Sequence, residues 1–397
     1  MIKRETYLNW LIKHQENGLI KVISGVRRSG KSTLFELFKD HLKTEYVTED
    51  QIIHLNFEDL RYYELRNFLS LNDYIQEKTS KNQKYYIFLD EIQIVEKFEE
   101  VVNSLNLQPN LDIYITGSNA YFMSGELATL LTGRYIELSI LPLSFKEFYS
   151  AHTDLSLTEV YDKYQKSAFP YLVNKDDEEE RNFYLRSAYN DITLKDIMTR
   201  YKITEQGILE RILRFLVSAI GSEISINKIA NTLKSQNVSV SNNTVEKYVD
   251  AFVNGLILYP VPRYDIKGRK LLQRLEKYYV VDLGFREMIL PDKKEDAGHI
   301  LENIIFLELK RRYKEVYVGK QGSLEVDFVC INQDNSLVYY QVALQTLDEE
   351  VLKRELRSLE SISDAYPKYL LTLDTLHKTA NYNGILKKNA LEWLLEV

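Results

Sequence analysis

The chain has 397 residues, of which 45% are hydrophobic and 27% are charged. This composition is typical of globular proteins and excludes disordered and collagen-like chains, and the length allows roughly two or three domains. With 58 acidic and 51 basic residues, the net charge of −7 excludes a basic surface spread over the whole chain and leaves only local patches for nucleic acid.

Two features bear on the cellular compartment. The single cysteine, Cys330, has no second cysteine with which to form a disulfide, as is usual in a reducing cytoplasm. No apolar run approaches the roughly 18 residues needed to cross a bilayer, and the N-terminus lacks the apolar stretch of a signal peptide. We therefore expect a cytoplasmic protein without a membrane partner.

From residue 18 to residue 148, short apolar runs alternate with segments of helical period. Near-continuous apolar strands between helices are typical of a parallel sheet that is covered on both faces. A helix is predicted at 31–42, and strands are predicted at 19–24, 51–57, 85–89, 112–116 and 134–138.

The rest of the chain divides by changes of pattern. The pattern of residues 146–202 predicts helices throughout this segment. The acidic run at 176–180 is interpreted as a solvated turn or a helix start. Residues 205–282 predict three helices and then two strands. From residue 298 we predict a smaller α/β unit with a long helix, strands at 315–318, 324–331 and 336–343, a further helix and a strand near 368–373.

A phosphate-binding loop is predicted between the first strand and the first helix. The residues from Gly25 to Ser32 match G-x-x-x-x-G-K-[ST] without a mismatch. Glycines allow the backbone amides to converge on phosphates, Lys31 supplies a charge between the β and γ phosphates, and the Ser32 hydroxyl ligates Mg²⁺. The predicted ATP-binding residues are Gly25, Val26, Arg27, Arg28, Ser29, Gly30, Lys31, Ser32 and Thr33.

Two carboxylates follow the apolar strand that ends at Leu89. We predict that Asp90 holds Mg²⁺ through water and that Glu91 orients and polarises the attacking water, because phosphoryl transfer depends on positioning. Alternatively, Asp90 and Glu91 could be solvent-exposed acidic residues at the end of a strand, without a catalytic role. The complete phosphate loop upstream argues against this alternative.

Two more catalytic candidates come from the following strands. Asn119, or failing it Ser118, lies just after a strand and is predicted to contact the γ-phosphate or the attacking water; a polar turn is the alternative. Arg134 lies at the start of the fifth strand, away from the catalytic edge. It could act as an arginine finger toward a neighbouring subunit, or it could be an ordinary surface arginine.

These motifs together resemble a prokaryotic branch of the AAA-type ATPases that carries a C-terminal domain of unknown function. The resemblance implies an ATP-binding core, a winged-helix middle and a nuclease-like C-terminal fold. The segments that carry it are 24–32, 89–93, 116–120, 133–134, 141–148, 277–284 and 325–329.

The middle of the chain has helix-turn-helix spacing. Helices are predicted at 225–233 and 242–249, with Ser241 as N-cap of the second, and a hairpin around 265–269 completes a winged helix. We expect it to serve in structure or in protein contacts, because the second helix carries Glu246 and Asp250. The alternative is nucleic-acid binding through the hairpin, whose six basic and two acidic residues between 263 and 277 form a local patch.

In the C-terminal part, Glu302, Asp327 and Gln341 fall where a restriction-endonuclease-like fold keeps its metal site. That chemistry needs a lysine two residues beyond the third position, where this chain has Ala343. We therefore expect nuclease activity to be lost, while Glu325 and Asp327 could keep a weak ion site.

The predicted fold class is α/β, with a P-loop parallel sheet and a helical lid followed by a winged helix and a small nuclease-like domain. We interpret the chain as a slow Mg²⁺-dependent ATPase that acts as a switch or machine on a protein partner, with a homo-oligomer allowed. A nucleic-acid-associated ATPase and a nucleotide-gated interaction module without significant turnover are the alternatives. The predicted domains are 1–150 (ATPase core), 151–204 (helical lid or linker), 205–290 (winged helix) and 291–397 (degenerate nuclease-like domain).

Overall fold

The computed structural model of the chain describes residues 2–117, 131, 133–291 and 296–396. It divides into two compact units, Met1–Pro142 and Leu143–Val397, which are described here one after the other. Among the described residues, no helix combines the length and the apolar character that crossing a membrane requires.

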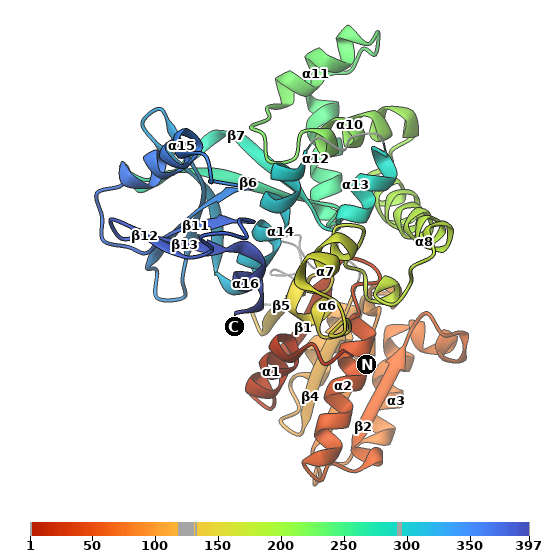
Figure 1. Cartoon of the computed structure of the whole chain (residues 1–397). Helices are drawn as coiled ribbons and strands as arrows, with labels where there is room; N and C mark the ends of the chain where they lie inside the picture. The colour runs from red at the N-terminus through yellow and green to blue at the C-terminus, as the bar shows by residue number, and fades with distance from the viewer. Residues whose placement is uncertain (1, 118–130, 132, 292–295, 397) are drawn as a thin grey trace. The chain divides into compact units, whose positions relative to one another are not determined.

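The first unit, drawn from red to orange in Figure 1, is built on a sheet of parallel strands. The order of the five strands is β2-β3-β4-β1-β5. All five strands predicted from the sequence are present, with ends shifted by one or two residues. The strands are β1 (Ile20–Gly25), β2 (Ile52–Asn56), β3 (Tyr85–Asp90), β4 (Leu111–Thr116) and β5 (Tyr135–Ile140). The helices are α1 (Glu5–His14), α2 (Lys31–Thr44), α3 (Phe68–Lys78) and α4 (Phe98–Leu105), with short helices η1 (Glu49–Gln51), η2 (Leu60–Arg66) and η3 (Ile92–Ile94).

Both faces of this sheet are covered, as the apolar strands predict. Successive residues of a strand point to opposite faces, so β3 contributes to two cores. Ile87 and Leu89 pack with residues of α3 and α4, whereas Phe88 packs with residues of α1 and α2 on the other face. A parallel sheet buried in this way brings the carboxyl ends of β1, β3 and β4 to one edge.

The second unit begins with helices and confirms two local predictions. Asp177 caps α8 by accepting a hydrogen bond from the Glu180 amide, so the acidic run is a helix start, and Ser241 caps α12. The helices are α6 (Phe145–Tyr149), α7 (Leu157–Tyr164), η5 (Pro170–Leu172), α8 (Glu178–Asn190), the π-helical η6 (Asp191–Met198), α9 (Thr199–Tyr201), α10 (Gln206–Ser218), α11 (Ile226–Ser235), α12 (Asn242–Asn254), α13 (Leu283–Ile289), α14 (Ala297–Arg312), α15 (Glu349–Glu360) and α16 (Ala390–Leu395).

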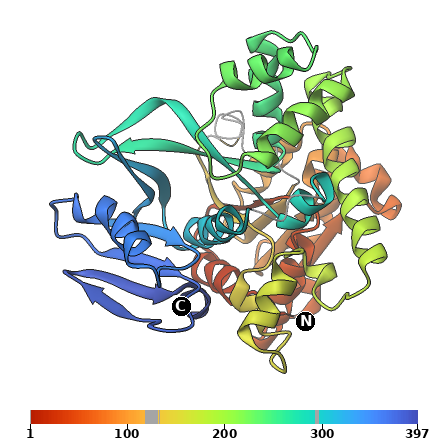
Figure 2. The same ribbon diagram turned by 45° about the horizontal axis from the view of Figure 1, so that its top comes forward.

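The second unit also contains an eight-stranded sheet of order β12-β13-β11-β10-β9-β8-β6-β7, whose strands alternate with helices α13 to α16 along the chain. The β6–β7 hairpin, drawn in teal in Figure 2, is part of this sheet. Its strand β6 pairs in parallel with β8, with Arg263 opposite Val318. The sequence did not predict β12, β13 or α16. The strands are β6 (Leu258–Asp265), β7 (Lys270–Val280), β8 (Glu315–Gln321), β9 (Leu324–Ile331), β10 (Leu337–Ala343), β11 (Lys368–Thr372), β12 (Ala380–Tyr382) and β13 (Ile385–Asn389).

Candidate functional site

The phosphate loop connects the end of β1 to the start of α2. Gly25 has a φ of 151°, and a Cβ at this position would lie 2.4 Å from the carbonyl oxygen of Ile140, so no larger residue fits there. Gly30, with a φ of 97°, is the N-cap of α2, and the Ser29 amide donates to the Val26 carbonyl at 3.2 Å. The loop is thus a tight turn that ends at a helix N-terminus, which is the backbone arrangement that binds phosphate.

Lys31 is buried at the first position of α2, with only 4% of its surface exposed. Its Nζ donates to the carbonyls of Gly25 at 3.0 Å and Val26 at 3.4 Å, and it lies 3.9 Å from Oε1 of Glu91. The ammonium is therefore held at the loop, next to the carboxylate predicted to act in catalysis. A phosphate oxygen would compete for it with these three acceptors.

Asp90 is the last residue of β3 and is fully buried. Its Oδ1 accepts a hydrogen bond from the Thr116 hydroxyl and its Oδ2 accepts one from the Asn56 side-chain amide at 3.3 Å. Thr116 also accepts a hydrogen bond from the Glu91 amide at 3.0 Å. One hydroxyl at the end of β4 therefore fixes both neighbouring acidic residues.

Thr116 and Asn56 were not singled out from the sequence as functional residues. A usable signal existed, because each ends a strand that neighbours β3, and parallel strands bring their carboxyl ends together. The order of the strands, which places β2 and β4 on either side of β3, could not be predicted from the sequence.

Glu91 has a left-handed backbone with a φ of 54° and is 8% exposed. Its Oε2 accepts a hydrogen bond of 2.5 Å from Nε2 of Gln93, and its Oε1 faces Lys31. The structure thus brings Lys31, Asp90 and Glu91 to one edge of the sheet. A carboxylate held in this way can orient a water molecule for attack on a phosphate.

The residues that would hold Mg²⁺ supply oxygen donors, which this cation prefers. Ser32 and Thr33 are exposed on the first turn of α2, and Ser32 follows Lys31 directly. The Asp90 carboxylate has its orientation fixed by Thr116 and Asn56. A hydroxyl and a fixed carboxylate fit a Mg²⁺ ion that travels with nucleotide phosphates.

The two remaining catalytic candidates are Asn119 and Arg134, and the structure describes only Arg134. Asn119 and its substitute Ser118 lie outside the described residues. Arg134 is exposed, and its carbonyl accepts a hydrogen bond from Ile20 at the start of β1, at the edge opposite the phosphate loop. A strand of this length spans about 17 Å, so Arg134 is far from the loop of its own chain.

Two family models match this chain, one over the unit that holds the phosphate loop and one further along. The family of the AAA domain matches residues 17–149, and a domain of unknown function (DUF8612) matches residues 158–296. An uncharacterized protein of Haemophilus influenzae is 40% identical over 402 residues, covering 100% of this chain and 99% of that protein. The chain belongs to this AAA-domain family. An uncharacterized protein of Methanocaldococcus jannaschii is 32% identical, covering 92% of this chain and 82% of its own length.

Two solved structures are similar to this AAA-domain chain at low identity. The AMPPCP-bound DnaA of Aquifex aeolicus is 13% identical with a TM-score of 0.33, covering 62% of this chain and 85% of that one. The Aeropyrum pernix ORC1 protein in complex with DNA is also 13% identical, with a TM-score of 0.32, covering 74% of this chain and 93% of that one.

A second cluster of charged residues lies in the C-terminal sheet of this AAA-domain chain. The buried Nζ of Lys277, on β7, lies 3.0 Å from Glu302, 2.9 Å from Glu325 and 4.0 Å from Asp327. The hydroxyl of Tyr279 donates to the same Glu302 oxygen at 2.5 Å. At Glu325 and Asp327, where the sequence predicts at most a weak ion site, the structure places a lysine ammonium that offsets the charge of the carboxylates.

The electrostatics of the cluster follow from this geometry. Burial raises the pKa of Asp327 to about 8, the charge of Glu302 acts in the same direction, and Lys277 acts against it. Burial alone would lower the pKa of Lys277, but the three carboxylates hold it above its ordinary value. Gln341 accepts a hydrogen bond from the Asp327 amide at 3.3 Å. In the described part of the chain, no group of His, Cys, Asp and Glu forms a metal site.

The basic patch expected on the hairpin is smaller than the sequence predicts. Lys277 is buried among carboxylates, and Arg263 pairs with Glu223 at 2.9 Å, so neither is available to phosphate. The exposed basic residues that the structure describes here are Lys267, Arg269 and Lys270. The acidic run on α8 is partly neutralised as well, since Lys163 pairs with Asp176 and Lys175 pairs with Glu180.

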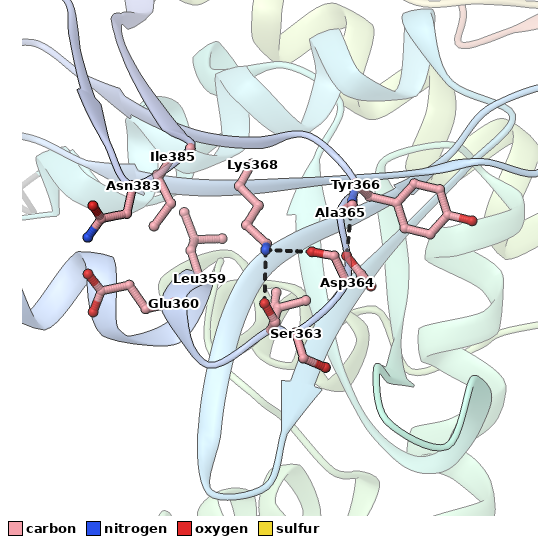
Figure 3. Close-up of a pocket in the computed structure, with 11 residues that line it drawn as sticks. Leu359, Glu360, Ser363, Asp364, Ala365, Tyr366, Lys368, Asn383 and Ile385 are labelled. Atoms are coloured by element: carbon pink, nitrogen blue, oxygen red, sulfur yellow. Dashed lines mark hydrogen bonds between the residues drawn. The ribbon is translucent and has the colours of Figure 1, made fainter.

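A pocket of about 490 Å³ lies between the end of α15, the turn after it and the β12–β13 hairpin. Figure 3 shows Lys368 reaching across it from β11. Its ammonium donates to the carbonyls of Ile362 and Asp364, both at 2.9 Å, and the Asp364 carboxylate accepts a hydrogen bond from Tyr339. Both charged groups thus have partners within the protein, and these hydrogen bonds connect the turn to β10 and β11.

Proposed function

We propose that this ATP-binding AAA protein hydrolyses ATP slowly, with Mg²⁺, and uses its nucleotide state to change its interaction with a partner protein. The observation that carries the proposal is the convergence of Lys31, Asp90 and Glu91 at one sheet edge, next to a complete phosphate loop. A loop without the two carboxylates would support binding alone.

Each residue has a separate part in this proposal. The loop amides and Lys31 bind the β and γ phosphates, and Ser32 and Asp90 hold Mg²⁺. When bound, Mg²⁺ neutralises charge on the phosphates. Glu91 orients the attacking water and draws a proton from it. Slow turnover is supported by the contacts of Glu91, because Gln93 and Lys31 both compete with water for its carboxylate.

The first test is nucleotide binding by Lys31→Ala. We expect this variant to lose binding of magnesium ATP, because the triphosphate loses its main cationic contact. Titration calorimetry on the full chain measures the affinity. The matched control is Lys43→Ala on the same helix, an exposed lysine that pairs with Glu49 at 2.6 Å and should bind as the wild type does. Equal affinity in Lys31→Ala and the wild type would exclude this phosphate site.

Arg134 offers a second test, of action between subunits. If its guanidinium completes the site of a second copy, turnover per chain should rise with protein concentration, and Arg134→Ala should lower it by up to about 10³-fold without changing nucleotide affinity. The readout is phosphate release at several protein concentrations. Turnover that is independent of concentration, with Arg134→Ala equal to the wild type, would show that this arginine has no catalytic part.

We further propose that residues 205–290 form a winged helix and residues 291–397 a degenerate nuclease-like domain, with 151–204 as a helical lid; the β6–β7 hairpin of the winged helix belongs to the same sheet as the strands of the nuclease-like domain. Support comes from the succession of α10, α11, α12 and the β6–β7 hairpin, and from the position of Asp327 beside Gln341. A protein partner is preferred to nucleic acid, because the hairpin keeps fewer exposed basic residues than its sequence suggests.

A further inference from the structure

The N-terminal segment before α1 contacts the phosphate loop through one side chain. We propose that Arg4 is a positioning residue that fixes the phosphate loop in its nucleotide-binding conformation; this inference rests on the function proposed above. Arg4 is only 5% exposed, although its guanidinium is charged at every pH relevant to proteins. A buried permanent charge needs strong acceptors, and two of the acceptors of Arg4 are backbone carbonyls.

The two ends of the guanidinium reach two different parts of the first unit. Its Nη1 donates to the Ser29 carbonyl at 2.8 Å, and its Nη2 donates to the Leu141 carbonyl at 2.7 Å. The ring of Tyr7, one turn further along, lies 4.7 Å from the guanidinium carbon, and its hydroxyl accepts a hydrogen bond from the Leu141 amide at 3.2 Å. Arg4 and Tyr7 together therefore hold both backbone groups of Leu141.

These contacts connect the end of β5 with both ends of the phosphate loop. Leu141 follows β5 directly, and the carbonyl of the preceding Ile140 lies against Gly25, where the loop begins. Arg4 connects the same stretch to Ser29, near the end of the loop. Because the guanidinium is a rigid planar fork, it fixes the two carbonyls relative to each other.

The peptide bond between Ser29 and Gly30 explains why this matters for phosphate. In a planar trans peptide, the carbonyl and the following amide point in opposite directions. With the Ser29 carbonyl held by Arg4, the Gly30 amide is directed away from Arg4, at the N-terminus of α2. The hydrogen bond from Arg4 thus orients the Gly30 amide as one donor of the phosphate-binding loop. It also keeps the Ser29 carbonyl oxygen from turning toward the phosphates.

The experiment measures the affinity of the full chain for magnesium ATP by titration calorimetry. Arg4→Ala should weaken binding by about 10- to 100-fold, the range for losing hydrogen bonds from a charged group. Arg4→Lys, whose ammonium is a single point of contact in place of a fork, should be intermediate. The control is Lys3→Ala, the exposed neighbouring cation, which should bind as the wild type does. Guanidinium chloride at millimolar, non-denaturing concentration should restore affinity to Arg4→Ala, whereas sodium chloride should not.

Rescue by guanidinium separates positioning of the loop from a general loss of folding. The inference would be overturned if Arg4→Ala bound ATP with wild-type affinity, or if guanidinium did not restore its lost affinity. If the alanine variant does not fold, Arg4→Lys replaces it, and wild-type affinity in Arg4→Lys would overturn the inference. A wild-type chain that binds no magnesium ATP would instead refute the proposed function. Binding that is lost in Lys31→Ala and unchanged in Arg4→Ala would refute only the role of Arg4.

Discussion

Glu91→Gln should bind magnesium ATP as tightly as the wild type and lower the turnover number by about 100- to 10,000-fold, the range for removing a general base. The amide has nearly the same shape as the carboxylate, so the loop and Lys31 remain in place, but it cannot draw a proton from water. Steady-state phosphate release measures turnover. Extraction of the bound nucleotide should give ATP from the variant and ADP from the wild type.

The matched control for this experiment is Glu96→Gln, which changes an exposed carboxylate five residues further along the same segment. It should leave both binding and turnover unchanged. If Glu91→Gln turns over ATP at the wild-type rate, the general-base assignment is wrong. If it also fails to bind ATP, Glu91 instead supports the phosphate loop through its contact with Lys31.

Lys277→Met should lower the free energy of unfolding by about 3–5 kcal/mol, the cost of leaving a buried charge without its partner. Three carboxylates surround the ammonium, and Glu302 and Asp327 are buried with it. Urea denaturation followed by circular dichroism measures the loss. The control, Lys267→Met, changes an exposed lysine of the same hairpin and should stay within about 0.5 kcal/mol of the wild type.

The dependence on pH gives this prediction a second readout. The folded pKa of Asp327 is about 8 and its unfolded value is near 3.9, so its contribution to stability is present at low pH and is lost as the pH rises through 8. Without Lys277 the carboxylates hold protons more tightly, so the loss should be larger at pH 9 than at pH 6. Adding Glu302→Gln should recover part of the stability. A loss below 1 kcal/mol, equal at both pH values, would contradict a neutralising role for Lys277.

The phosphate site was predictable because its signals are local. The glycines, Lys31 and the carboxylates at the end of β3 each follow an apolar strand, and the carboxyl ends of parallel strands meet at one edge. The five-stranded sheet is confirmed. The structure also places Lys31 next to Glu91. The roles of these residues in ATP hydrolysis remain predictions until the variants are measured.

The contacts that the sequence did not predict connect residues far apart in the chain. Arg4 and Ser29 are 25 residues apart, and Arg4 and Leu141 are 137 apart, so only the fold brings them together. Lys277 was counted as a basic residue of the hairpin, although its position two residues before Tyr279 places both on one face of β7. Both faces of the strand are buried here, since Lys277, Tyr278 and Tyr279 are all buried.

The pairing of β6 with β8 has a consequence for dividing the chain into fragments. A cut after residue 290 would leave one side of β6 and one side of β8 with open hydrogen-bonding edges, which are templates for aggregation. The cut would also remove Ile266 from the core that it shares with Val326 and Leu356. The hairpin and the C-terminal strands should therefore unfold as one cooperative unit, and protection of their amides from hydrogen exchange should be lost together.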